Sequence, residues 1–266
     1  MQFKINFQLH ELDKIIPWGY NNDHMHWFGL TDGLLWINAG DDVIYEYSQA
    51  ARDHWKDDIK YNDYQLARFL EDFTGIFQFV RESVPKALYD IVGDFDELTF
   101  NWKNKHIDEP DELFEKFYDE EYIPLTEWFQ KRVFDSGHLT GGPNIGCFRH
   151  EDKLKLYWES DYTLENGHSI WTSPKGVIEM NYDDFITETE RSIDSFFIDM
   201  DKQVELAVLK DWGKVEIDKE RVITENVERK AAFKKEISSL RHKTDKPTDW
   251  DKVEFLYKKM MKELNQ

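Results

Sequence analysis

Apolar and polar residues alternate at the start of the chain. The apolar positions of this alternation are Phe3, Ile5, Phe7 and Leu9. A period of two residues is typical of a strand with one buried face. Two more β-rich runs, at 34–38 and 43–47, lie on either side of turn-forming residues at 40–42, and this pattern predicts a hairpin. The first part of the chain therefore predicts a small antiparallel sheet.

The spacing of apolar residues then changes. Between 66 and 80 they recur every three or four positions, which predicts a helix with an aromatic inner face. Pro110 and Pro124 are placed to open two short helices, because proline fits the first helical turn. Strand-like runs follow and predict a second antiparallel sheet of three or four strands. These runs are 147–150, 153–159, 169–172 and 177–181.

Helical patterns fill the rest of the chain. Apolar positions from Phe185 to Leu209 predict a long helix that covers one face of the second sheet. Two charged segments, 218–241 and 248–264, predict helices joined at 242–247. The expected fold class is α+β, with two small antiparallel β-sheets, each packed with α-helices, plus a C-terminal helical hairpin.

These patterns also suggest how the chain is divided. Residues 1–212 are expected to form an α+β core, which is either one unit or two lobes at about 1–137 and 138–212. Residues 213–266 are expected to form a charged helical C-terminal extension. With 19 Phe, 12 Tyr and 10 Trp among 266 residues, the chain has ample aromatic material for a sizeable core.

The sequence predicts a cytoplasmic protein. Its single cysteine, Cys147, excludes an internal disulfide, which suits a reducing compartment. The N-terminal sequence has no basic stretch followed by an apolar segment, so we expect no secretory signal peptide. No run of about eighteen apolar residues is present, so we expect no membrane span.

Acidic residues exceed basic ones, and the excess is uneven. The whole chain has a net charge of −20, from 54 Asp plus Glu and 34 Lys plus Arg. Residues 213–266 hold 14 basic and 11 acidic residues, a net of +3, so residues 1–212 carry −23. This charge argues against direct binding of nucleic acid or an anionic membrane and favours encounter with a basic protein. Ordinary solubility is the alternative explanation.

The most acidic local segment runs from Asp108 to Glu121, where carboxylates are interleaved with Leu113, Phe114 and Phe117. This spacing predicts an amphipathic helix with an acidic outer face. Such a face can bind the Arg and Lys side chains of a basic protein, or it can be an ordinary solvated face. The candidate partner-binding residues are Asp111, Glu112, Glu115, Asp119, Glu120 and Glu121.

Signals for catalysis and for metal binding are weak. His24 and His26 are two residues apart, so a strand would direct both imidazoles to one face, where they are weak candidates for a metal site. No other motif supplies further ligands at a diagnostic spacing, and we predict no metal, no cofactor and no catalytic residue. Cys147 fits a small buried residue better than a nucleophile. The glycine-rich segment 139–146 predicts a loop.

Two stretches of the sequence, 12–36 and 142–200, resemble a known family. The first holds Pro17-Trp18-Gly19 and the run from His26 to Gly33, and the second holds seven further matching positions. These positions are Gly142-Pro143, Arg149, Trp158, Trp171, Gly176 and Phe185. Together the stretches resemble a bacterial family, the domain of unknown function 5984, over most of the first 210 residues. The resemblance implies a shared fold and a bacterial cytosolic origin, and it implies no reaction.

The acidic charge and the lack of a catalytic signature favour a non-enzymatic protein that binds a basic protein partner. The most concrete form of this hypothesis is an immunity protein or antitoxin that neutralises a basic toxin domain such as a nuclease. The alternative is a hydrolase or ligand sensor with a pocket between the two lobes, which would use carboxylates and the histidines His24, His26 or His138. A third hypothesis is a scaffold that acts through its charged C-terminal helices. The sequence leaves the oligomeric state open.

Overall fold

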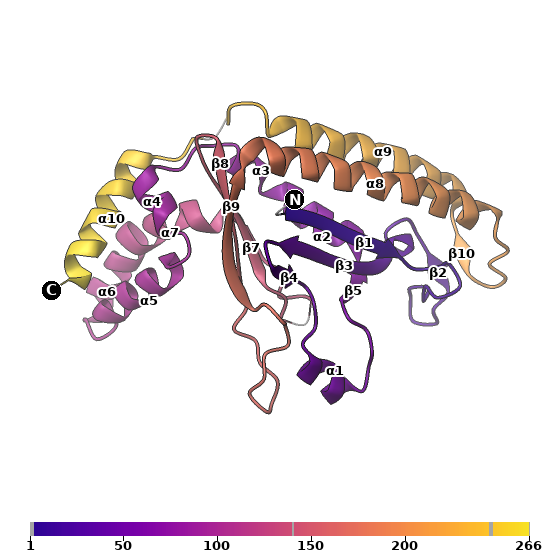
Figure 1. Cartoon of the computed structure of the whole chain (residues 1–266), viewed down its shortest axis with the longest axis horizontal. Helices are drawn as coiled ribbons and strands as arrows, with labels where there is room; N and C mark the ends of the chain where they lie inside the picture. The colour runs from indigo at the N-terminus through magenta and orange to yellow at the C-terminus, as the bar shows by residue number, and fades with distance from the viewer. Residues whose placement is uncertain (1–2, 140, 245–246, 266) are drawn as a thin grey trace.

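The structure of the chain, a computed structural model, is a mixed α+β fold and confirms the predicted class. It describes residues 3–139, 141–244 and 247–265. Figure 1 shows α8 and α9 side by side along one long edge, the strands β7, β8 and β9 in the middle, and a group of helices at the C-terminal end. Thr140, in the predicted loop, and residues 245–246, in the predicted helix connection, lie outside the described residues.

The first sheet has the strand order β1-β3-β4, with β5 also paired to β3, and all its pairs are antiparallel. Its buried face includes Ile5 and Ile37, which lie directly opposite each other in β1 and β3. Gly33 lets these strands come close, because a Cβ atom there would lie 2.5 Å from the carbonyl oxygen of Gln8. The predicted sheet and its hairpin are confirmed. The strands are β1 Phe3–Leu9, β3 Asp32–Ala39, β4 Asp42–Ile44 and β5 Asn62–Gln65.

The second sheet is antiparallel in the order β6-β7-β8-β9. Three of its strands confirm predictions, but residues 169–172 make isolated bridges, such as Trp171 with Tyr47, and β6 supplies the fourth strand. Trp158 packs on Gly176 of the next strand, where a Cβ atom would lie 2.1 Å from the indole ring. The strands are β6 Val133–Phe134, β7 Asn144–His150, β8 Lys153–Glu159 and β9 Lys175–Asn181.

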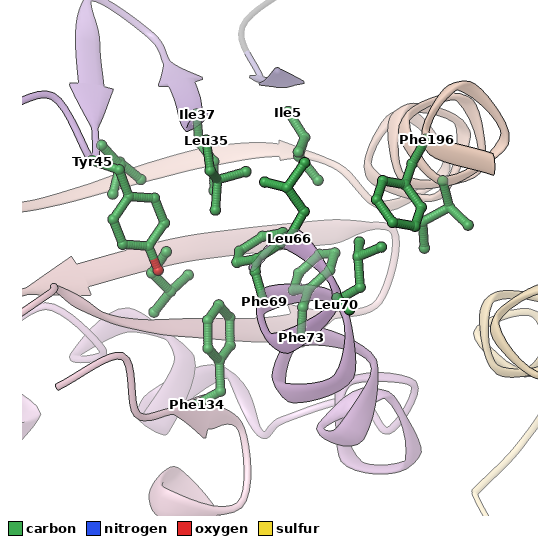
Figure 2. Packing of buried hydrophobic residues seen from close by; sticks show 14 of the residues in the cluster. Ile5, Leu35, Ile37, Tyr45, Leu66, Phe69, Leu70, Phe73, Phe134 and Phe196 are labelled. Carbon is green, nitrogen blue, oxygen red and sulfur yellow. The ribbon is translucent and has the colours of Figure 1, made fainter. Parts of the chain in front are cut away.

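A first hydrophobic core fills the space between the two sheets and the helices α2, Leu66–Gly75, and α8, Tyr182–Leu209. The apolar faces predicted by the helical spacing of these two segments are the faces that the core buries. Figure 2 shows how side chains from four parts of the chain meet there. They include Ile5, Leu35 and Ile37 from the first sheet, Phe69 and Phe73 from α2, Phe134 from β6, and Phe196 from α8.

The second sheet separates this core from another one. Alternate residues of a strand point to opposite faces, so Leu156 of β8 lies in the first core and Tyr157 in the second. Phe148 of β7 joins Tyr157, and helices cover both. The helices of the second core are α4 Lys86–Asp90, α5 Phe95–His106, α6 Asp111–Phe117, α7 Ile123–Gln130 and α10 Trp250–Leu264.

The two predicted C-terminal helices are present, but each joins a different core instead of packing on the other as a hairpin. Helix α9, Lys219–Ser239, lies along α8 and buries Phe233 in the first core. Helix α10 packs against α5 and α7 and buries Leu256 and Met260 in the second core. Each apolar face thus finds a larger hydrophobic surface than a second charged helix offers. The division of the chain at residue 212 stays a prediction.

Short elements complete the fold. Strand β2 pairs in parallel with β10, which joins the loop after β1 to the segment between α8 and α9. Among the described residues, no helix combines the length and the hydropathy that crossing a membrane requires. The remaining bounds are β2 His24–Met25, η1 Gly29–Thr31, α1 Gln49–Trp55, α3 Phe77–Val80, η2 Tyr118–Tyr122 and β10 Glu216–Ile217.

Candidate functional site

The acidic segment of the sequence forms one helical run made of α6, Asp111–Phe117, then η2, Tyr118–Tyr122, and then α7. The middle part, η2, is a π-helix. Pro124, which was expected to open a separate helix, lies in the first turn of α7, and α7 continues the run without a break. Proline has no N–H to donate to the carbonyl of Glu120, so the wider π-turn lies where an α-helical hydrogen bond is missing. Such π-turns occur frequently at functional sites.

The structure places all six predicted partner-binding residues on this run. Asp111, Glu112 and Glu115 on α6 are exposed, and so are Asp119 and Glu120 on η2. None of these five carboxylates forms an ion pair with another residue that the structure describes. We call these five residues the acidic face. Helix α6 lies at the opposite end of the molecule from β2 and β10 (Figure 1).

Glu121 and the buried side of the run hold it in place. Glu121, the sixth predicted residue, is half-buried and forms an ion pair with Lys259 of α10. The ring of Phe117 is buried and stacks on His106 of α5, with 3.8 Å between ring centroids. The ring of Trp102 meets Phe117 edge-on at 4.8 Å. These contacts fix the inner side of the run and leave the acidic face toward solvent.

A ladder of aromatic rings borders the acidic face. Phe114, Tyr118 and Tyr122 are spaced four residues apart and are half-buried. Tyr118 stacks on Phe114 and on Tyr122, with centroid distances of 6.0 Å and 5.3 Å. The ammonium of Lys103 lies 5.3 Å from the Tyr118 centroid and 5.6 Å from the Tyr122 centroid. The ladder therefore already contacts one cation, and the same chemistry suits a Lys or Arg side chain of another protein.

Exposed apolar side chains accompany the acidic residues along the same segment. Ile107, Leu113 and Ile123 expose 58%, 54% and 42% of their surface. They lie just before α6, within it and at the start of α7. Protein interfaces combine such apolar anchors with a charged rim, so the segment has both components.

The two histidines that were weak metal candidates both line an open cavity of about 710 Å³ between β2 and the segment after α8. The His24 nitrogens lie 3.5 Å from Asp23 and 3.6 Å from Glu216. His26 instead uses Nδ1 to accept a hydrogen bond from the backbone N–H of Gly29 at 3.2 Å. Burial lowers the pKa of His26, which favours its neutral form.

Among the described residues, the neighbours of these two histidines do not form a set of metal ligands. Within residues 3–139, 141–244 and 247–265, no group of three or more His, Cys, Asp or Glu side chains is arranged to hold a metal ion. His138, the third histidine of the alternative hypothesis, lies beside Tyr64 and Asp72. It does not line the cavity of His24 and His26.

Cys147 is fully buried in β7, and burial raises the pKa of its thiol. The neutral thiol is therefore the favoured form, in agreement with a small buried residue. Strand β7 begins at Asn144, so the last part of the predicted loop 139–146 is strand.

Sequence reasoning missed a buried ion pair. Arg132 donates to Glu82 with 2.6 Å between nitrogen and oxygen, and the two side chains expose 0% and 9% of their surface. Glu82 also accepts from the backbone N–H and the hydroxyl of Thr248 and from the indole N–H of Trp250. The pair thus connects the end of α3, the end of α7 and the start of α10. No local pattern could have signalled partners that lie 50 and 166 residues apart.

A second missed cluster lies between α5 and the second sheet. The hydroxyl of Tyr157 lies 3.0 Å from an Asp96 oxygen and also contacts Glu159, which pairs with Lys175 at 2.8 Å. One hydroxyl can donate to only one carboxylate at a time. Burial raises the pKa of Asp96, which favours its protonated form.

The run from His26 to Gly33, which carries part of the family resemblance, has a structural role here. Trp27 is fully buried, and its indole N–H donates to Asn226 of α9 at 2.9 Å. Asn226 in turn donates to Asp201 of α8 at 2.8 Å. The Arg229 guanidinium lies 4.6 Å from the centre of the Trp27 ring. The run therefore anchors the helix pair to the first sheet.

Comparison with family models gives one finding. A model described as a family of unknown function (DUF5984) matches residues 4–256. The match includes both stretches that carry the resemblance and extends beyond them through α9 and into α10. Comparison with curated proteins and with solved structures gave no match.

Proposed function

We propose that this chain, which belongs to the DUF5984 family, binds a basic protein through its acidic face. In its most concrete form, the proposal makes it a cytoplasmic immunity protein or antitoxin that neutralises a basic toxin domain such as a nuclease. A nuclease holds phosphates on a cationic surface, so a protein that occupies this surface blocks the enzyme and needs no catalytic group of its own.

The observation that supports the proposal most directly is the lack of intramolecular ion pairs at the acidic face. Five exposed carboxylates within three helical turns have no basic partner among the described residues. Their mutual repulsion costs some stability, and a cationic surface would relieve it. The net charge of −23 on residues 1–212 adds long-range attraction for the same kind of partner.

The neighbouring rings and aliphatic side chains would supply the affinity that exposed charges alone rarely provide. Leu113 and Ile123 offer apolar contact, and Tyr118 and Tyr122 offer ring faces to a cation. We therefore expect Arg and Lys side chains of the partner to contact the aromatic ladder, with the carboxylates around them.

The test is affinity capture with the tagged full chain from its native host at low ionic strength, followed by elution with salt and mass spectrometry. The expected result is one stoichiometric basic protein that salt releases, because exposed charge contacts are screened at high ionic strength. The triple substitution E112K/E115K/E120K should weaken the purified complex by about tenfold or more, from three contacts of about 0.5 kcal/mol or more each.

A matched variant separates the acidic face from net charge. The substitution E165K/E205K/E228K changes the charge by the same amount at three exposed carboxylates elsewhere, and these also lack ion pairs with described residues. This variant should retain the partner. The proposal fails if no basic protein is retained, or if both triple variants weaken the complex equally.

A further inference from the structure

Strand β9 forms one edge of the second sheet. It pairs with β8 on its inner side and is the last strand in the order β6-β7-β8-β9. We propose that the outer side of β9 pairs with β9 of a second copy of this chain, in the antiparallel direction. The two four-stranded sheets then continue as one sheet across a dimer. This surface is separate from the acidic face, so the inference does not depend on the function proposed above.

The hydrogen bonds at the two ends of the β8–β9 pair show which backbone groups of β9 point outward. The N–H of Ser160 donates to the carbonyl of Pro174 at 2.7 Å, and the N–H of Tyr182 donates to the carbonyl of Asp152 at 2.8 Å. In an antiparallel pair, only alternate residues bond to the neighbouring strand. The even-numbered residues of β9 therefore bond to β8, and the backbone groups of the odd-numbered residues point away from it. The first three of these outward residues are Lys175, Val177 and Glu179.

The outward backbone groups of these three residues are open to another strand. None of their N–H and C=O groups is hydrogen-bonded to a part of the chain that the structure describes, and all three residues are exposed. Strand β1, an edge strand of the same length in the first sheet, differs in this respect. Its Ile5 is bonded through both backbone groups to side chains of α8. An open edge of seven residues is a template for a further strand.

The charges of β9 favour its own copy as that further strand. Lys175 and Glu179 lie two residues before and two residues after Val177. When Val177 lies opposite Val177 of the second copy, each Lys175 therefore lies directly opposite a Glu179. All three opposed pairs then join outward residues, so each pair can exchange two backbone hydrogen bonds. Opposite charges directly across two strands stabilise the pairing, and like charges destabilise it.

The present contacts of these side chains are compatible with the pairing. Lys175 forms an ion pair with Glu159 at 2.8 Å and keeps 48% of its side chain exposed. Glu179 accepts a hydrogen bond from the hydroxyl of Tyr89 at 3.0 Å. An ammonium has three donors and a carboxylate has several acceptor sites, so each group can make a further contact. Val177 exposes 45% of its surface and adds an apolar contact with its own copy.

The first test measures self-association of the full chain by sedimentation equilibrium. One strand pair makes a small interface, so the protein is measured up to millimolar concentration. Salt at about 0.15 M screens the repulsion between two chains that carry −20 each. We expect a reversible equilibrium between monomer and dimer. A chain that stays monomeric over the whole range overturns the proposal.

Charge reversals then test the register. Lys175→Glu and Glu179→Lys each place like charges opposite each other at two positions of the dimer, so each should weaken the dimer by about tenfold. A mixture of the two variants should form a heterodimer about as tight as the wild-type dimer, because every opposed pair then joins one Glu and one Lys. This recovery also shows that both variants are folded.

The matched control is Glu165→Lys, which changes the net charge by the same amount at another exposed carboxylate. If only net charge governs self-association, both Glu→Lys variants should strengthen it, because they reduce the repulsion between copies. The proposed register instead requires Glu179→Lys to weaken the dimer and Glu165→Lys to leave it at least as tight. The proposal fails if the two variants behave alike, or if the mixture does not restore association.

Hydrogen exchange locates the interface without a substitution. The backbone N–H groups of Val177 and Glu179 should exchange quickly in dilute protein and slowly in concentrated protein. The N–H of Ile178, which is bonded to β8, should exchange slowly in both and is the internal control. Protection that grows with concentration on another segment, and not on β9, would place the dimer interface elsewhere and overturn the proposal.

Discussion

Two highly charged helical regions of this molecule differ in whether their carboxylates form ion pairs. Along the α8–α9 pair, basic residues of α9 meet acidic residues of α8, as in Lys230–Asp201 at 2.7 Å and Lys234–Asp194 at 3.0 Å. At the acidic face on α6 and η2, five carboxylates have no such partner among the described residues. In both regions the sequence pattern predicts charged helices.

The difference teaches where the excess negative charge acts. Exposed ion pairs add little stability, but they cancel the electric field that their members would create. Much of the charge of α8 and α9 is therefore compensated, with 8 basic against 12 acidic residues in the two helices, whereas α6 and η2 hold 6 acidic residues and one basic residue. The field of the acidic face is left uncompensated. Net charge alone could not have distinguished the two regions, and only the second one is suited to attract a cationic partner.

The largest expected effect concerns the buried Glu82–Arg132 pair, which connects α3, α7 and α10. Glu82→Ala leaves the Arg132 guanidinium buried without its counter-ion and removes the acceptor of Thr248 and Trp250. We expect the free energy of unfolding to fall by about 3–5 kcal/mol, measured by urea denaturation. The exposed pair Glu127–Lys131 is the control, and Glu127→Gln should cost less than about 1 kcal/mol. Equal losses in both variants would contradict the structure.

A smaller loss of stability is expected at the contact between α9 and the buried Trp27. Asn226→Ala leaves the buried indole N–H of Trp27 without an acceptor, so unfolding free energy should fall by about 1–3 kcal/mol. The triple substitution E112Q/E115Q/E120Q at the acidic face should change it by less than about 0.5 kcal/mol, because no folded-state contact is lost. The contrast between the two regions is contradicted if the acidic-face variant is the less stable of the two in urea.

The sequence predicted the elements whose pattern is local and missed the contacts that join distant segments. Strands β1, β3 and β8 and helix α8 carry a clear period of two or of three to four residues along a single stretch. The edge of β1 shows the limit of such patterns. Glu188 accepts from the backbone N–H of Ile5 at 2.9 Å, and Arg191 donates to the backbone carbonyl of Ile5 at 2.8 Å. These partners lie more than 180 residues apart, so no periodicity reveals them.

The same limit applies to the candidate site. The acidic residues could be found from composition, since they follow one another along one helix. Whether they are paired depends on which helix packs beside them, and this is a property of the whole fold. Glu121 illustrates the point, because it belongs to the same cluster in the sequence but is neutralised by Lys259 of α10.

The dependence of stability on pH provides a finer comparison among the helices of the second core. Burial raises the pKa of Asp96, so the folded state holds its proton more tightly than the unfolded state does. Unfolding free energy should therefore decrease as the pH rises from 3.8 through the raised pKa, and it should stay lower above it. Asp96→Asn removes this decrease and still lets Tyr157 donate a hydrogen bond.

The measurement is the difference in urea midpoint between Asp96→Asn and wild type across this pH range. The variant should gain stability relative to wild type as the pH rises, and the gain should vanish in strong acid. Asp111→Asn on the acidic face is exposed and serves as the control for the removal of one carboxylate. A flat profile for Asp96→Asn would mean that its carboxylate is well solvated.

The smallest expected effect tests whether the paired charges matter for binding at all. Lys234→Met removes one member of the Lys234–Asp194 pair, whose side chains expose 53% and 56% of their surface, and should change unfolding free energy by less than about 0.5 kcal/mol. The variant frees one carboxylate far along the chain from the acidic face.

If the partner responds only to the total field, association should become faster at low salt, to the same extent as for a neutralised lysine at any exposed position. If the acidic face makes the contact, Lys234→Met should leave the dissociation rate unchanged, whereas Glu115→Gln should raise it. Stopped-flow or surface-based kinetics with the captured partner separates the two cases, and equal dissociation rates for the two variants would show that the unpaired carboxylates contribute field but no contact.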